Sequence, residues 1–137
     1  MEICESVFIS QSSEKIWDFL LLVSTDVQWR VDYTKTEWTS QPPYCIGSTG
    51  IHHHKKMGAI PWTIIKWEEG RHMEWIIGES MFKDSIGSYH VEPENDGSLV
   101  TIHSKMVLPF IMRFIMALLG RKVVKADLQR LKALMEN

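Results

Sequence analysis

The chain has 137 residues, enough to bury one sizeable core but too few for two ordinary domains, so we expect a single ligand-binding domain over residues 1–137. Hydrophobic residues make up 45% and charged residues 23%, the balance of a globular rather than a disordered protein. The 15 basic and 17 acidic residues give a formal charge of −2. Because no basic excess is present to neutralise phosphates, a nucleic-acid partner is not expected.

The cysteines and the apolar segments bear on the compartment. Cys4 and Cys45 are too few for a disulfide framework, which favours free thiols in a reducing compartment. The beginning of the chain lacks the basic start and apolar run of a secretory signal. The longest apolar stretch, residues 107–120, is interrupted by proline and arginine and is shorter than the roughly 20 residues that cross a bilayer. We therefore expect a cytoplasmic protein without stable membrane insertion.

The chain is predicted to begin with a strand and two short helices. Residues 3–9 mix β-branched and aromatic residues with polar ones, which is typical of a strand. Ser12 and Ser13 then offer hydroxyls to the free amides of a new helix, and apolar residues at helical spacing predict that helix over residues 13–23. A second short helical turn is expected over residues 26–29.

The middle of the chain has the period of two that is typical of strands. The alternation predicts six strands joined by short turns rich in proline, glycine, asparagine and aspartate, and such turns connect antiparallel neighbours. The predicted strands cover residues 32–40, 46–57, 62–68, 72–81, 85–92 and 99–106.

A long helix closes the chain, because the apolar period returns to 3.6 at Phe110 and continues to the end. Helices are not interleaved between the strands, so a layered α/β fold is excluded. The predicted fold class is α+β: a seven-stranded curved antiparallel sheet wrapped around a long C-terminal helix, with two short helices after the first strand. A curved sheet closed by one helix leaves a space that side chains need not fill.

Several local phrases accompany this order of elements. They are Ile9 to Trp17 at the first strand and helix, Trp29 in the second helix, Ile46-Gly47-Ser48, Trp67 to Trp75 in a hairpin, Tyr89 to Pro93, and Leu131 to Glu136 at the end. In this order and spacing, over essentially the whole length, the chain resembles the helix-grip superfamily. That superfamily includes the START-like lipid-transfer domains and the polyketide cyclase/dehydrase-like (SRPBCC) proteins.

The resemblance implies a helix-grip fold with an internal hydrophobic cavity. The family shares this cavity rather than a catalytic motif, and its members include carriers, hormone receptors, cyclases and hydratases. No catalytic residue is therefore carried over to this sequence, because a shared fold does not determine activity.

Side-chain alternation selects the residues that would face the space between the sheet and the last helix. In the hairpin around Gly70, one face carries Thr63, Ile65 and Trp67 on the first strand and Met73, Trp75 and Ile77 on the second. Aromatic rings beside a gap provide shape and stacking. We predict that the ligand is contacted by Trp67, Trp75, Ile77, Tyr89, Ile102, Met106, Phe110 and Phe114.

Residues 110–119 at the start of the last helix are apolar nearly all round, whereas an ordinary surface helix has a polar face. Three interpretations remain open. The segment is buried beneath loops, forms a methionine-rich wall of the ligand pocket, or presents a patch for self-association or membrane contact. A homodimer is therefore a possible assembly.

The run His52-His53-His54 looks like a metal site. Consecutive strand residues point to alternate faces, so at most His52 and His54 share a side, fewer than the three or four ligands that zinc needs. We interpret the run as solvated or edge-strand histidines and expect neither a metal nor another cofactor.

The candidates for acid–base chemistry are Glu74, His90, His103 and Asp84. By the same alternation Glu74, His90 and His103 lie opposite the ligand-facing row, and a register shift of one residue would turn these three inward. His103 would then be the best proton carrier, because imidazole titrates near neutral pH. Arg30 could meet an anionic ligand at the cavity mouth, although a solvated surface arginine is the simpler interpretation.

Two functions follow from the cavity. The favoured hypothesis is the binding, carriage or sensing of a small apolar molecule of lipid, isoprenoid or polyketide type. The alternative is a cyclase or dehydratase that acts on a similar substrate by positioning and one proton transfer, which requires an ionisable group inside the cavity. A third hypothesis is a protein-interaction domain that uses residues 110–119.

Overall fold

The computed structural model describes residues 1–137 and contains seven strands and three α-helices, with a single 3₁₀ turn η1 (Val23–Thr25). The helices are α1 (Ser13–Leu21), α2 (Asp26–Trp29) and α3 (Phe110–Glu136). The strands are β1 (Glu2–Ile9), β2 (Tyr33–Trp38), β3 (Thr49–His54), β4 (Gly58–Glu68), β5 (His72–Ile77), β6 (Ile86–Glu94) and β7 (Gly97–Lys105).

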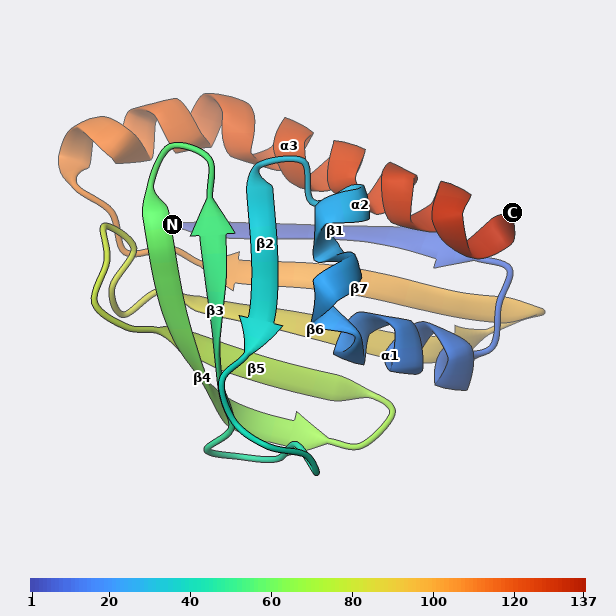
Figure 1. The fold of residues 1–137 in the computed structure, drawn as a ribbon. Coiled ribbons are helices and arrows are strands. Elements are labelled where there is room, and N and C mark those ends of the chain that lie inside the picture. Colours follow the sequence, from blue (N-terminus) through green and yellow to red (C-terminus); the bar gives the residue numbers. More distant parts are fainter.

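All seven strands form one antiparallel sheet in the order β1-β7-β6-β5-β4-β3-β2. The sheet bends so that β2, β3 and the adjoining half of β4 lie across the other strands, and α3 runs along the open side beside β1 (Figure 1). The predicted α+β helix-grip fold, with its long C-terminal helix and two short helices after the first strand, is confirmed.

Local sequence explains how α1 begins and packs. The hydroxyl of Ser12 accepts a hydrogen bond from the amide of Lys15, which caps the first turn as predicted. Ile16, Trp17 and Leu20 recur at helical spacing and are all buried against the sheet.

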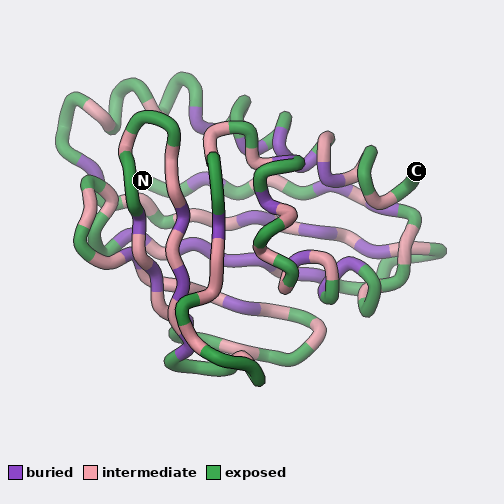
Figure 2. The backbone as a smooth tube through the Cα atoms, viewed as in Figure 1, coloured by how far each residue is buried: buried purple, intermediate pink, exposed green.

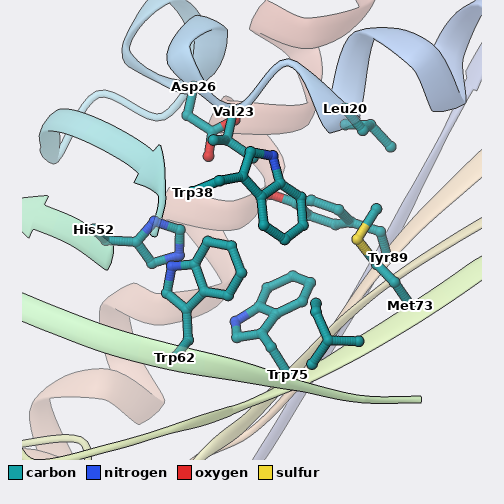
Figure 3. Close-up of a pocket in the computed structure, with 10 residues that line it drawn as sticks. Leu20, Val23, Asp26, Trp38, His52, Trp62, Met73, Trp75 and Tyr89 are labelled. Atoms are coloured by element: carbon teal, nitrogen blue, oxygen red, sulfur yellow. The ribbon is translucent and has the colours of Figure 1, made fainter. Parts of the chain in front are cut away.

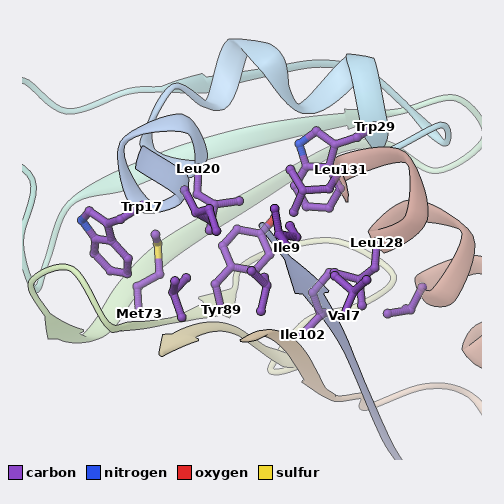
Figure 4. Packing of buried hydrophobic residues seen from close by; sticks show 14 of the residues in the cluster. Val7, Ile9, Trp17, Leu20, Trp29, Met73, Tyr89, Ile102, Leu128 and Leu131 are labelled. Carbon is purple, nitrogen blue, oxygen red and sulfur yellow. The ribbon is translucent and has the colours of Figure 1, made fainter. Parts of the chain in front are cut away.

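The solid part of the core lies at one end of the molecule. Its largest fully buried side chains include Trp17 and Leu20 of α1, Trp29 of α2, and Leu128 and Leu131 of α3 (Figure 4). Buried residues follow the middle of the strands and the C-terminal half of α3, whereas the N-terminal half of α3 is mostly exposed (Figure 2). The core therefore fills only part of the space between the sheet and the helix.

The predicted alternation needs one correction, on β4. Ile64 pairs with Trp75 but Lys66 pairs with Glu74, so Ile65 is an extra residue in a β-bulge. Thr63 and Ile65 were expected to face inward with Trp67, and for these two residues the prediction is wrong. The inward row of β4 is instead Ile60, Trp62, Ile64 and, beyond the bulge, Trp67.

Candidate ligand-binding cavity

A cavity of about 370 Å³ lies between the bent sheet and the N-terminal half of α3. Its lining draws residues from all seven strands and from α3, and 15 of its 25 residues are hydrophobic. This volume falls within the range of pockets that hold small organic ligands. Lys56 and Leu119 line the cavity and are exposed, so it opens to solvent between the β3–β4 turn and α3.

Two glycines shape the cavity by allowing close approach. A Cβ added to Gly120 would lie 2.6 Å from Cδ1 of Ile3, so α3 packs closely on β1 at this glycine, and a larger residue would require the end of the Ile3 side chain to move. A Cβ added to Gly87 would lie 2.7 Å from the Trp75 ring, so the indole lies flat against the β6 backbone. The helix is thus anchored beside Gly120, and the residues before it form one wall of the cavity.

Apolar and flexible side chains form most of the lining. Ile60 and Ile77 contribute from the sheet, and Met106 follows β7. Met112 and Met116 face them from α3. Unbranched methionine side chains adapt to ligands of different shape.

The inner end of the cavity is polar and is organised by Arg30, which directly follows α2. The guanidinium Nε donates to Oδ2 of Asp127 at 3.1 Å, Nη1 donates to the Tyr89 hydroxyl at 2.9 Å, and Nη2 donates to the Tyr33 hydroxyl at 3.3 Å. The planar group also lies 4.9 Å from the centre of the Tyr33 ring. Arg30 therefore links the end of α2 to α3 and to the strands β2 and β6.

Burial sets the protonation of the acids beside Arg30. Burial raises the pKa of the Asp26 carboxyl from 3.8 to about 7, and the charge of Arg30 limits the rise. Burial also raises the pKa of Asp127, again opposed by Arg30. Oδ1 of Asp26 is buried without a hydrogen-bond partner, and Oδ1 of Asp127 makes no hydrogen bond but lies 3.5 Å from Nη2 of Arg130. The polar end thus holds two buried carboxyl groups beside Arg30.

His52 joins this polar end from β3. Its Nδ1 lies 3.1 Å from the Thr36 hydroxyl, and its ring stacks on Tyr33 with centroids 4.5 Å apart. Burial, reinforced by the nearby charge of Arg30, lowers the pKa of His52 to about 3, so the imidazole is neutral at pH 7. Burial raises the pKa of Tyr33 and of Tyr89, so both phenols keep their protons.

A second, smaller space adjoins the cavity and shares His52 and Trp75 with it. Figure 3 shows Trp38, Trp62, Trp75 and Tyr89 converging on this space from the sheet, with Asp26 at its rim. Its volume is about 20 Å³, room for about one water molecule. The aromatic rings therefore nearly fill the region between the cavity and the core.

The predicted ligand contacts divide into three groups. Trp75, Ile77 and Met106 line the large cavity, and Tyr89 lines the smaller space. Trp67 and Ile102 face inward but pack in the core, with Trp67 in edge-to-face contact with Trp17 at 5.4 Å. These two side chains therefore belong to the core and not to the surface of either space.

The placement of Phe110 and Phe114 on the cavity side is wrong, because their side chains are 85% and 70% exposed. The helical residues that line the cavity are Met112, Ile115, Met116 and Leu119, which lie on another face of α3. The segment is apolar on both faces, so its periodicity could not indicate which face meets the sheet.

The interpretation of the histidine run also needs correction. His52 is only 5% exposed, although we expected solvated or edge-strand histidines. His52 and His54 do share a side and both line the cavity. Nδ1 of His54 accepts from the amides of Lys56 and Met57 and so organises the β3–β4 turn. No group of three or more His, Cys, Asp or Glu residues is arranged to hold a metal ion.

The remaining acid–base candidates lie outside the cavity. Glu74 pairs with His72 at 3.0 Å, and His103 lies 3.7 Å from Glu2. Together with His90 they occupy the face of the sheet opposite the buried rows, as the alternation predicts. None of the three lines either space.

Sequence reasoning missed the residues of the polar end, above all Arg30, Asp127 and Tyr33. Arg30 was interpreted as a solvated arginine, yet its side chain is only 15% exposed. The available signal was Asp127, a lone acid between Val124, Leu128 and Leu131 on the buried face of the last helix. A buried carboxylate needs a cationic partner.

Comparison with known proteins identifies the family. The chain belongs to the family described as polyketide cyclase / dehydrase and lipid transport, whose model matches residues 2–136. The predicted relationship to the START-like, SRPBCC proteins is thereby confirmed. No curated protein sequence matches the chain significantly.

Solved structures share the fold at low sequence identity. A START superfamily protein from Mycobacterium smegmatis superposes with a TM-score of 0.80 at 12% identity, covering 98% of this chain and 96% of that chain. The Aha1 dimer from Colwellia psychrerythraea gives a TM-score of 0.73 at 16% identity over 99% of this chain and 96% of that one. The di-domain ARO/CYC StfQ from the steffimycin biosynthetic pathway gives 0.76 at 8% identity over 98% of this chain and 50% of that one. Identities this low show the fold alone.

Proposed function

We propose that this protein is a cytoplasmic carrier or sensor that binds one small, largely apolar molecule in the cavity of about 370 Å³. The observation that carries the proposal is the composition of the lining: aliphatic, methionine and tryptophan side chains around most of the space, and one polar end at Arg30. A ligand site of this kind gains affinity from apolar burial and orientation from a few polar groups. The family description, which names lipid transport, agrees with such a ligand.

The polar end favours an uncharged head group. The charge of Arg30 is already matched by Asp127 at 3.1 Å, so an anionic ligand would leave one negative charge without a partner. Asp127 lines the cavity, and its Oδ1, which makes no hydrogen bond and lies 3.5 Å from Nη2 of Arg130, is the acceptor we assign to a ligand hydroxyl. The ligand we propose is therefore an apolar molecule with one hydroxyl-bearing end.

A titration with a neutral apolar fluorophore, N-phenyl-1-naphthylamine, tests the proposal. Ser104 lines the cavity, so Ser104→Phe should fill part of it and weaken probe binding at least tenfold. Ser6 lies exposed on the neighbouring strand β1, so Ser6→Phe adds the same ring outside the cavity and should leave binding unchanged. Equal binding by both variants would contradict an internal site.

Acid–base catalysis is a second candidate, favoured by Asp127, which lines the cavity, and by Asp26, which lines the adjoining smaller space. A group whose pKa lies near neutral pH both gives and accepts protons readily, and that of Asp26 is raised to about 7. Native mass spectrometry of the molecule that co-purifies with wild type and with Asp26→Asn distinguishes the two functions. A dehydratase predicts that Asp26→Asn retains a species heavier by one water, whereas a carrier predicts the same mass in both proteins.

A further inference from the structure

The first turns of α3 present large apolar side chains to solvent. Phe110, Ile111, Phe114 and Leu118 are 85%, 75%, 70% and 62% exposed, and we call these four residues the apolar tip. The contacts of α3 are chiefly with β1 and α2, and nothing covers the tip. A contiguous apolar surface of this kind is typical of an interaction site.

Basic residues continue the same helical face. Phe114, Leu118, Arg121 and Lys125 follow at spacings of four, three and four, so they lie along one side of α3. We call Arg121, Lys122 and Lys125 the basic collar. Arg121 pairs with Glu5 at 2.9 Å, whereas Lys122 and Lys125 are exposed and form no ion pair.

Apart from Glu5, which pairs with Arg121 from β1, acidic residues are absent from the stretch of chain that carries the collar. No aspartate or glutamate occurs in residues 97–126, although the chain as a whole carries a formal charge of −2. The positive charge is therefore concentrated around α3. The exposed Lys55 and Lys56 add to it from the β3–β4 turn, and Lys56 lines the same cavity as Met112.

The tip and the collar follow one another along the helix axis. At about 1.5 Å per residue, the collar begins roughly 5–15 Å beyond the tip. Amphipathic segments at membranes bury their apolar residues about 5–10 Å into the boundary between head groups and acyl chains. A helix that inserts its tip end-first thus brings its collar to the level of the lipid phosphates.

We propose that α3 docks the protein, tip first, on the surface of a bilayer that contains anionic phospholipids. The charge pattern selects this partner over a second copy of the chain. Two copies joined through their tips would bring like charges of Arg113, Lys122 and Lys125 together, whereas lipid phosphates neutralise them. The contact is peripheral, because no helix of the chain is long and apolar enough to cross a bilayer.

Docking in this pose brings the cavity opening to the membrane. Met112, Met116 and Leu119 lie in the same turns as the tip, line the cavity, and face it from the other side of the helix. An apolar molecule that leaves the bilayer there reaches the cavity without crossing bulk water. Docking itself does not depend on whether the cavity binds a ligand.

Flotation of the full chain with vesicles tests the proposal. Wild type should float with vesicles of phosphatidylcholine that contain about a third phosphatidylglycerol, should not float with phosphatidylcholine alone, and should dissociate as salt is raised. Lys122→Glu with Lys125→Glu should reduce binding at least about tenfold, since each basic residue near an anionic surface contributes to the attraction. Phe110→Ser with Phe114→Ser should reduce it at least as much.

Matched controls carry the same chemical changes elsewhere. Lys15→Glu with Lys66→Glu reverses two exposed lysines outside the collar, and Leu22→Ser with Ile46→Ser removes two exposed apolar side chains outside the tip. Both controls should bind vesicles like wild type, and circular dichroism should show all variants folded. The proposal is overturned by wild type that ignores anionic vesicles, by tip or collar variants that bind unchanged, or by a concentration-dependent dimer that the tip variant abolishes without any vesicle binding.

Discussion

In the C-terminal half of α3, Val124, Leu128 and Leu131 are at most 8% exposed, whereas in the N-terminal half Phe110 and Phe114 are at least 70% exposed. The first half has the more hydrophobic sequence, yet it buries less. The C-terminal half packs on β1 and α2 and completes a solid core, whereas the N-terminal half closes a cavity on one side and meets solvent on the other. Hydrophobicity alone therefore does not determine burial; the position of the segment relative to the sheet does.

Arg30 lies at the boundary between the two regions, and its loss should have the largest effect. Arg30→Met removes the nearer cationic partner of the buried Asp127 carboxylate, leaving only Arg130 at 3.5 Å, and should lower the free energy of unfolding by about 3–5 kcal/mol at pH 7. Denaturant titration measures the loss. The double variant Arg30→Met/Asp127→Leu removes both charges and should recover most of it; a double variant as unstable as the single one would contradict the ion pair's role.

Truncation of apolar side chains should separate the solid region from the open one. Leu128→Ala should cost about 3 kcal/mol, because it leaves a void in packed surroundings. Met116→Ala should cost less than about 1 kcal/mol, because its side chain borders a space that already exists. Urea unfolding of both variants gives the comparison, and equal losses would mean that the two halves of α3 are packed alike.

Two buried groups, Asp26 and His52, should change the free energy of unfolding in opposite directions as the pH rises. The folded-state pKa of Asp26 is raised to about 7, so its contribution to stability is complete below about 3.8 and is lost as the pH rises through 7. The folded-state pKa of His52 is lowered to about 3, so its contribution is complete above about 6.5 and is lost as the pH falls through 3. The two effects partly cancel between pH 4 and 6.5, each being on the order of 3 kcal/mol.

Single variants separate these contributions. Relative to wild type, Asp26→Asn should become more stable as the pH rises from 4 to 7, and His52→Asn should become less stable as the pH rises from 3 to 6.5. The surroundings of both variant sites contain other titratable groups, namely Arg30, Asp127, Tyr33 and His54. Because these groups are present in wild type and in the variants, the difference in free energy of unfolding at each pH isolates the variant site. Parallel pH profiles for the three proteins would contradict the assigned burial of these groups.

Side chains at the apolar tip should have the smallest effect on stability. Phe114→Ser removes a side chain that is 70% exposed and should change the free energy of unfolding by less than about 0.5 kcal/mol. Thermal unfolding followed by circular dichroism measures the change. A loss above about 2 kcal/mol would mean that Phe114 packs against the fold.

The sequence predicted those features that depend on local pattern. The order of elements and the inward row of Met73, Trp75 and Ile77 on β5 follow from alternation and turns, and the structure agrees. The bulge at Ile65 was not predictable, because neither glycine nor a turn residue marks it. Because the expected alternation was continuous through the bulge, it placed Trp67, beyond the bulge, on the correct face and Thr63, before it, on the wrong one.

The polar end of the cavity depends on contacts between distant parts of the chain. Arg30 and Asp127 are 97 residues apart, and neither stands in a motif. A lone arginine after a short helix is more often solvated, so its burial becomes evident only when α2 packs on α3. Similarly, α3 begins with residues that are apolar all round, so the choice of Met112 over Phe110 as a cavity residue depends on the tertiary structure.

Native mass spectrometry of freshly purified protein tests the internal ligand site most directly. Wild type and Ser6→Phe should each give a one-to-one non-covalent complex with a small apolar molecule, and Ser104→Phe, whose new ring occupies the cavity, should lose that complex. Ligand-free wild type that also fails to take up apolar molecules with a hydroxyl end, or a complex that survives in Ser104→Phe, would contradict the internal ligand site.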